Sequence, residues 1–279
     1  MLSILYGITS ALSWGAGDFA GGLASRKVGA YRAVLYAYFF GLLILIAASF
    51  FYRESFPASN IVFNSFIAGA LGSFGLLVLY YSLSIGQMSV AAPVSALFAT
   101  LLPVIFSAVT EGLPSTIQFV GFVLALAAVW LISQGDGGFH IGKLSDLKFP
   151  ILAGLGFGCY YIFIHNAASD PDTLLWPLVL SRLAGVILLF IIVLARRESF
   201  PIPNGAWGIV LINAVLDLGG NFFFILASKT GRLDIAAILS SLYPGVTVTL
   251  AWLILKERMT RNHWVGIFIA LLAILLLTK

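Results

Sequence analysis

Residues 174–195 read LLWPLVLSRLAGVILLFIIVLA, an apolar run of 22 residues with a single charged side chain, Arg182. An α-helix rises about 1.5 Å per residue and the hydrocarbon core of a bilayer is about 30 Å thick, so this run is long enough to cross a membrane. Nine comparable stretches recur along the 279-residue chain. The ten predicted spans are 4–25, 31–52, 63–85, 90–110, 115–134, 148–167, 174–195, 207–228, 233–255 and 263–278.

These spans are predicted to be helices, because their continuous apolar runs lack the alternation of a membrane β-barrel. Hydrophobic residues make up 61% of the chain and charged residues 9%, too few charges to cover the surface of a soluble domain. The first apolar run lacks a positively charged start and is too long for a signal peptide, so we expect a retained helix. The fold class predicted is therefore an all-α integral membrane protein.

Basic residues lie between the apolar runs, where they face lipid headgroups and water, so no nucleic-acid partner is expected. The one cysteine, Cys159, excludes an internal disulfide and any multi-cysteine metal site, and no cofactor is expected. The histidines, His140, His165 and His263, are scattered, without the clustered groups of a membrane-embedded enzyme. The chain has no Walker motif, so ATP hydrolysis is not expected either.

A glycine-rich segment near residues 135–147 separates two similar halves. A shift of 145 residues places Ser95 on Ser240 and Gly121 on Gly266. Five helices per half is an odd number, so the second half must enter the membrane from the opposite side, which gives an inverted repeat. We therefore predict repeats at 1–139 and 148–279, a linker at 140–147 and a central cavity between the repeats.

Lysine and arginine are distributed unevenly over the predicted loops. Ten lie in loops after odd-numbered spans, four lie on the opposite side, and Arg182 lies within a span. The positive-inside rule, taken alone, places both termini outside the cell.

With these features the sequence resembles the drug/metabolite transporter superfamily, in its ten-helix EamA-like branch. The resemblance is carried by Ser13-Trp14-Gly15 with Asp18, by Pro103…Glu111…Gly121, and by Pro244…Lys256-Glu257-Arg258…Gly266. It implies a secondary transporter of the plasma (bacterial inner) membrane that exports amino acids, related metabolites or drugs in exchange for protons. It also implies cytoplasmic termini, in conflict with the charge count.

Asp18, Arg182 and Asp217 are the three clear cases of charged residues in the interiors of the predicted spans, away from the span ends. A charge at the centre of a bilayer costs at least about 2.5–3.5 kcal/mol, so each needs a partner or a wet cavity. Ser10, Trp14 and Asp18 share one helix face at i, i+4 and i+8 spacing. Asp18 is the first candidate for proton coupling; alternatively it is a static partner of an arginine, or caps a helix break near Gly21-Gly22.

Asn213, Asp217 and Asn221 repeat this spacing in the eighth span. Three polar groups on one line favour a face toward a substrate cavity, with Asp217 as second proton candidate; a buried network between helices is the alternative. Arg182 suits a substrate carboxylate, although an ion pair with Asp18 or Asp217, or snorkelling to a headgroup, is equally compatible with its position.

Aromatic and hydroxyl side chains complete the predicted cavity, a mixture that suits a mid-sized amphipathic solute. The further candidates are Tyr80, Ser84, Ser95, Phe98, Tyr161, His165, Ser240 and Tyr243. Interfacial aromatic belts, and a hydrogen-bonded helix end for His165, are the structural alternatives. Pro103 and Pro244 fall inside spans and predict kinks, which are either hinges or static bends.

The expected partners are a small organic solute, protons and membrane lipids, and a monomer is expected because ten helices can enclose a complete pathway. An uncoupled facilitator or exchanger is the alternative function, and a membrane-embedded enzyme is a weaker one.

Overall fold

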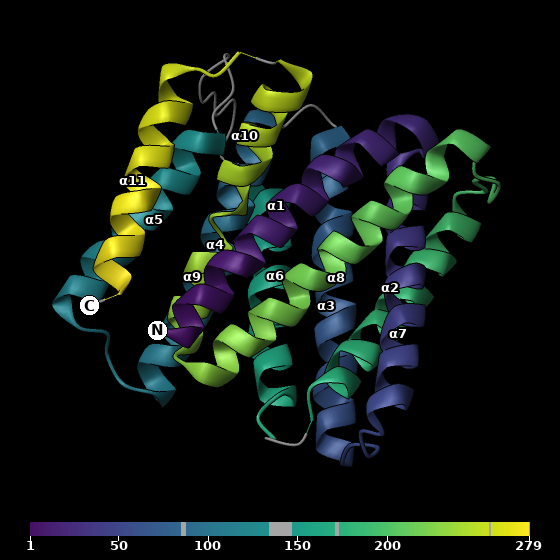
Figure 1. Ribbon diagram of the computed structural model, residues 1–279, viewed down its shortest axis with the longest axis horizontal. Helices are drawn as coiled ribbons and strands as arrows, with labels where there is room; N and C mark the ends of the chain where they lie inside the picture. Colours follow the sequence, from purple (N-terminus) through teal and green to yellow (C-terminus); the bar gives the residue numbers. More distant parts are fainter. Residues whose placement is uncertain (85–87, 134–146, 171–172, 257, 279) are drawn as a thin grey trace.

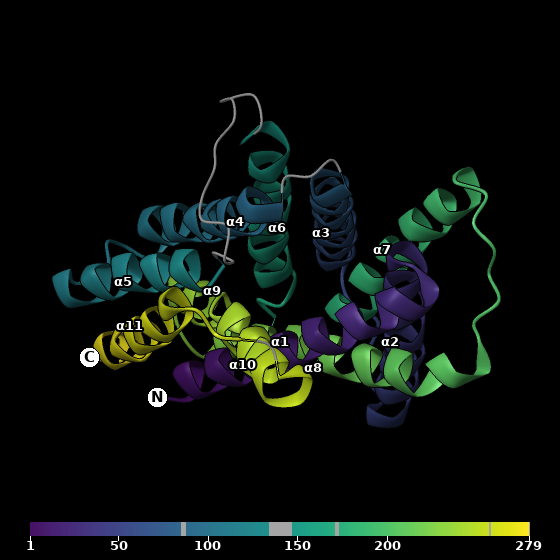
Figure 2. The same ribbon diagram turned by 90° about the horizontal axis from the view of Figure 1, so that it is seen from above.

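The computed structural model describes residues 1–84, 88–133, 147–170, 173–256 and 258–278; the side chains of residues 80 and 83–93 also lie outside the described part. The described residues form α-helices and one short 3₁₀ helix, with no β-strand among them (Figures 1 and 2). The helices are α1 (Leu2–Val28), α2 (Ala30–Tyr52), α3 (Ser59–Ser84), α4 (Met88–Thr110), α5 (Thr116–Ser133), α6 (Lys148–Ala167), α7 (Leu175–Ala195), η2 (Asn204–Ala206), α8 (Trp207–Thr230), α9 (Leu233–Ser240), α10 (Tyr243–Leu255) and α11 (Arg261–Leu277).

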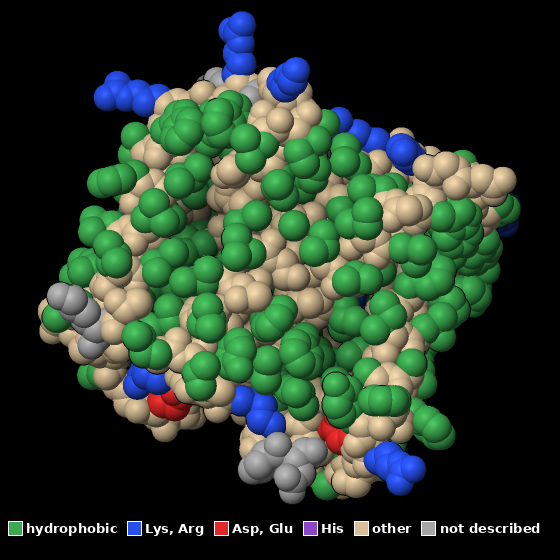
Figure 3. Space-filling model, viewed as in Figure 1, with side chains coloured by type: hydrophobic (Ala, Val, Ile, Leu, Met, Phe, Trp, Pro, Cys, Tyr) green, Lys and Arg blue, Asp and Glu red, His purple; other side chains and the backbone are tan. Residues whose placement is uncertain are grey.

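Seven helical segments of the described chain are long and apolar enough to cross a membrane. They are Ala30–Tyr52, Ser59–Leu79, Thr116–Ser133, Lys148–Ala167, Leu175–Ala195, Asn204–Thr230 and Leu233–Leu255. Val94–Thr110 and Arg261–Leu277 are apolar but shorter. In the space-filling view, hydrophobic side chains are spread over the whole visible face, and lysine and arginine lie mainly at its two ends (Figure 3).

Nine of the ten predicted spans overlap one helix each, whereas the ninth, residues 233–255, is divided into α9 and α10. Pro244 occupies one of the first two positions of α10, where its missing N–H breaks no helical hydrogen bond. The helical segment 233–255 is thus interrupted directly before Pro244, and whether this interruption acts as a hinge stays a prediction. Pro103 lies buried within α4, which runs without a break from Met88 to Thr110.

The helix contacts of the two halves correspond. α1 packs along α8 as α6 packs along α3, and α2 meets α8 as α7 meets α3. α1 also contacts α9 and α10, as α6 contacts α4, while α2–α7 and α5–α11 join matching helices of the two halves (Figures 1 and 2). Exchanging the first five helices with the later ones therefore reproduces the main contacts.

Close helix approach depends on small residues and on hydroxyls that donate to backbone carbonyls. Ser3, Ser10 and Ser13 of α1 donate to carbonyls of α8, each at 2.8 Å. A Cβ added at Gly220 of α8 would overlap the indole of Trp14. Small-residue contacts of this kind let helix backbones approach closely inside a membrane.

Candidate functional site

A buried ion pair links two helices of the second half. Arg182 of α7 and Asp217 of α8 pair through Nη2 and Oδ2, with 4% of the arginine side chain and 28% of the aspartate side chain exposed. The guanidinium carbon lies 4.2 Å from the ring centroid of Tyr38 in α2, a cation–π arrangement. Of the predicted roles for Arg182, the structure therefore contains the ion pair with Asp217, and not one with Asp18.

A second polar contact continues this network along α8. The hydroxyl of Tyr160 in α6 donates to Oδ1 of Asn221, and Nδ2 of Asn221 donates to the Asp217 carbonyl at 2.6 Å. A polar cavity of about 20 Å³ borders the network, which is room for about one water molecule. Its lining is Tyr38, Gly69, Gly72, Ser73, Tyr160, Ser181, Arg182 and Asn221.

The third member of the predicted α8 stripe, Asn213, faces α1. A Cβ added at Gly21 would lie 3.2 Å from Oδ1 of Asn213. Asn213, Asp217 and Asn221 thus contact three different helices, α1, α7 and α6. This arrangement corresponds to the alternative given for these residues, a network between helices. A role of their side chains in substrate binding stays a prediction.

Asp18 lies on α1 beside this network. A Cβ added at the preceding Gly17 would lie 3.2 Å from the Asp217 backbone nitrogen, so the two helices touch here. The Asp18 side chain is exposed, and it interacts electrostatically with Asp217 and with the hydroxyls of Tyr161 and Tyr243. Among the described residues no lysine or arginine lies within ion-pair distance of it.

Two of the alternatives for Asp18 are therefore not what the structure contains. It is not the static partner of an arginine in the described chain, because Arg182 pairs with Asp217. It does not cap a break near Gly21-Gly22 either, because α1 is continuous from Leu2 to Val28.

An aromatic cluster lies one turn from Asp18. The ring centroid of Trp14 lies 6.0 Å from that of Tyr161 and 5.9 Å from that of Phe224, and the last two are 4.5 Å apart. Phe224 and Tyr38 were not among the sequence candidates. Both lie in apolar helices, where the sequence gives no signal that separates them from packing residues.

The remaining candidates are spread over the structure. Ser95 is buried in α4, Phe98 of the same helix packs over Gly154, and Ser240 is buried at the end of α9. His165 is half-buried in the last turn of α6. The side chains of Tyr80 and Ser84 lie outside the described residues.

Ser10 serves helix packing, through its bond to the Gly220 carbonyl. Thr247 of α10 donates to the carbonyl of Gly15 at 2.9 Å, so α10 is tied to α1 three residues before Asp18.

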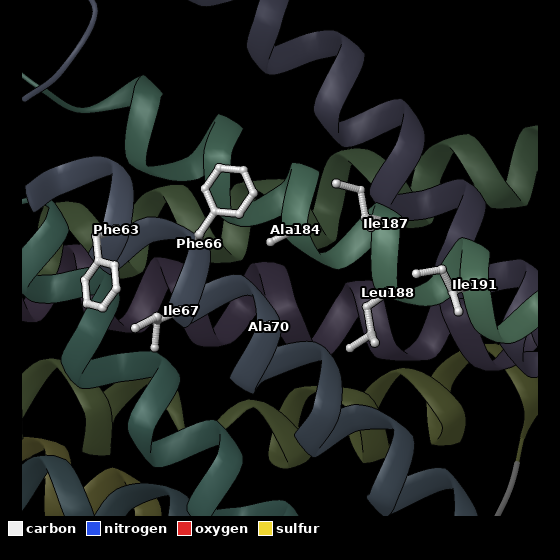
Figure 4. A pocket seen from close by; sticks show the side chains of 8 residues that line it. All are labelled: Phe63, Phe66, Ile67, Ala70, Ala184, Ile187, Leu188 and Ile191. Atoms are coloured by element: carbon white, nitrogen blue, oxygen red, sulfur yellow. The ribbon is translucent and has the colours of Figure 1, made fainter. Parts of the chain in front are cut away.

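A larger groove of about 430 Å³ also lies between α3 and α7 (Figure 4). Phe63, Phe66, Ile67, Ala70, Ala184, Ile187, Leu188 and Ile191 line it. Its lining holds no polar side chain that could orient a ligand, so it is a weaker site candidate than the polar groups of α1, α7 and α8.

The fold and these buried polar groups define a helical membrane protein with an interior polar site. A sequence profile of the EamA-like transporter family matches residues 1–134 and 147–279. The chain therefore belongs to the EamA-like transporter family, as its motifs predicted, and it is a multi-pass integral membrane protein.

One of two curated relatives is itself described as a transporter. The chain is 26% identical over 287 residues to an uncharacterised transporter of Archaeoglobus fulgidus, covering 99% of this chain and 98% of the relative. It is 31% identical over 128 residues to an uncharacterised protein of Methanocaldococcus jannaschii. This match covers 46% of this chain and 92% of that protein. One protein crystal structure superposes with a TM-score of 0.83 at 16% identity, covering 99% and 96% of the two chains, and so shares the fold.

Proposed function

We propose that the protein exports small organic solutes across the plasma (bacterial inner) membrane, by alternating access between two inverted repeats at residues 1–139 and 148–279. Three observations support the duplication: the family profile matches each half, a relative has the size of one half, and the helix contacts correspond after exchange of the halves. Inverted repeats supply two related conformations that open to opposite sides of the membrane. We assign the protein no enzymatic activity.

Coupling to protons is proposed to occur at Asp18. The observation that carries it is that one of two neighbouring carboxylates has a cationic partner and the other has none among the described residues. Arg182 neutralises Asp217, while no described cation neutralises Asp18. An unpaired carboxylate charge is costly inside a membrane protein, and a proton is the remaining counter-charge for Asp18. Because the Asp18 side chain is exposed, a proton can reach and leave it without breaking a salt bridge.

The solute is proposed to bind in the same space, against the aromatic rings of Trp14 and Tyr161. Binding of a solute beside Asp18 would displace the water that stabilises its charge, which links solute and proton occupancy. Amino acids and related metabolites or drugs, which combine a polar group with an apolar part, suit such a lining.

The test is transport by purified protein in proteoliposomes, over a panel of amino acids, nucleobases and cationic drugs, with and without an imposed pH gradient. Asp18→Asn is compared with wild type and with Asp170→Asn, a loop control. Gradient-dependent flux that is lost only in Asp18→Asn supports the proposal. Gradient-independent flux in wild type would identify a facilitator or exchanger, and gradient-driven flux in Asp18→Asn would remove the coupling role.

A further inference from the structure

The pentapeptide Arg-Glu-Ser-Phe-Pro occurs twice, at residues 53–57 and 197–201. The first copy follows α2 and the second follows α7, the matching helix of the other half, at opposite ends of the molecule (Figure 1). Arg53 and Arg197 both adopt a left-handed backbone conformation, with φ of 52° and 55°. In each copy the N–H of the following glutamate, Glu54 or Glu198, donates to the carbonyl five residues earlier, at 3.3 Å and 3.1 Å respectively. The two copies therefore share one local fold.

The first copy caps a helix of the other half. The Glu54 carboxylate accepts hydrogen bonds from the N–H of Leu174 at 2.6 Å and of Leu175 at 2.9 Å. Nε1 of Trp176 donates to the Glu54 carbonyl at 3.1 Å, and the Trp176 ring meets that of Phe56 at 5.0 Å. Leu174, at the N-cap of α7, has no polar side chain to offer. Glu54 therefore satisfies the first N–H groups of α7 and places a negative charge at the positive end of its dipole.

The second copy docks on α2 without making the equivalent cap. Arg32 donates to the Ser199 carbonyl at 3.0 Å, and the Tyr36 hydroxyl donates to the Phe200 carbonyl at 2.6 Å. The Glu198 carboxylate, however, accepts from Nε of Arg196 at 3.3 Å. The N-cap of α2 is Gly29, which supplies no side-chain cap. The two copies of the pentapeptide thus differ in what their glutamate binds: Glu54 binds the N-terminus of α7, and Glu198 binds Arg196.

We infer that Glu54 and Glu198 are reciprocal latches of the transport cycle. In the conformation described here, Glu54 caps α7 and holds that end of the molecule together. In the opposite conformation Glu198 leaves Arg196 and caps α2, while Glu54 releases α7. The inference rests on the proposed alternating access, since two inverted repeats exchange their conformations during such a cycle.

One substitution between the copies biases this exchange. Arg196 precedes the second pentapeptide, and the matching position of the first copy is Tyr52. Glu198 therefore has a cationic competitor for its cap position, whereas Glu54 has none at that place. Arg196 is held in turn by Tyr31, whose ring centroid lies 4.4 Å from the guanidinium carbon. This competition favours the conformation in which Glu54 is latched.

The test measures distances at both ends of the protein, in nanodiscs, with pairs of spin labels on a Cys159→Ala background. The exposed residues Ser55 and Ser169 report the end held by Glu54. The exposed residues Arg26 and Asn204 report the opposite end. Each pair joins one half of the chain to the other.

Glu54→Gln is expected to lengthen the first distance and shorten the second, with the two populations shifting about five- to tenfold, the factor typical of losing one helix cap. Arg196→Tyr is expected to shift them in the same direction although Glu54 is intact, which separates the latch from any folding defect of Glu54→Gln. Arg258→Gln, an exposed position away from both pentapeptides, is the control and should leave both distances unchanged.

Unchanged distances in Glu54→Gln and Arg196→Tyr would overturn the latch, as would a shift of both ends in the same direction. Transport by wild type is recorded in parallel. If wild type transports and the distances do not respond, the latch alone fails. If wild type carries no solute, the proposed function fails, whatever the distances show.

Discussion

Removing the negative charge of the buried ion pair should destabilise the protein strongly. Asp217→Asn leaves Arg182 charged with 4% of its side chain exposed. Breaking a buried pair from one side typically costs about 3–5 kcal/mol, because the remaining charge keeps its desolvation cost without a partner. Arg182→Gln should cost less, roughly 1–3 kcal/mol, since 28% of the Asp217 side chain is exposed and the loss is then mainly of packing on Tyr38.

The double variant, Asp217→Asn with Arg182→Gln, removes both charges but also the packing on Tyr38, so it should return to about the stability of Arg182→Gln, roughly 1–3 kcal/mol below wild type. The free energy of unfolding would be measured in detergent micelles by SDS titration, followed by tryptophan fluorescence. Arg196→Gln is the exposed control, because 53% of the Arg196 side chain is exposed and such pairs contribute about 0–1 kcal/mol. A double variant as unstable as Asp217→Asn, or an Asp217→Asn protein as stable as wild type, would refute the reasoning.

The same unfolding assay checks three further substitutions. Tyr160→Phe leaves Oδ1 of Asn221 without its donor and should cost about 1–3 kcal/mol, whereas the exposed Tyr52→Phe should change nothing measurable. Gly220→Ala should cost roughly 1–3 kcal/mol because the new methyl group overlaps the tryptophan of α1, while Gly22→Ala, which meets no neighbouring atom, should be neutral or slightly stabilising. Thr247→Val removes the 2.9 Å bond from α10 to a carbonyl of α1 and should cost about 0.5–1.5 kcal/mol.

Helix positions were predictable because they depend on local hydrophobicity, which can be read directly from the sequence. The break after Ser240 was not, because residues 233–255 are apolar throughout and Pro244 fits either a kink or a new first turn. Length and apolarity alone do not distinguish one long helix from two short ones in sequence.

The charged members of the site were also predictable, since charges within apolar spans are few. Their partners were not, because Arg182 had two carboxylates in possible reach and only the packing of α7 and α8 decides for Asp217. The contribution of Tyr38 depends in the same way on the approach of α2 to α7. The pentapeptides at 53–57 and 197–201 are 144 residues apart, one fewer than the 145 that separate Ser95 from Ser240, so no single offset aligns both parts of the halves.

The first helix shows why the site lies where it does. Although α1 has 27 residues, it is not among the described segments that qualify as spans by apolarity. Its hydroxyls and glycines, which lower its hydropathy, are the groups that contact α8, and α9 and α10 cover it further. A helix that packs on several others needs less lipid-compatible surface. The same packing of α1 on α8 places Asp18 beside Asp217, so the low hydropathy of this helix and the position of the candidate site have one structural cause.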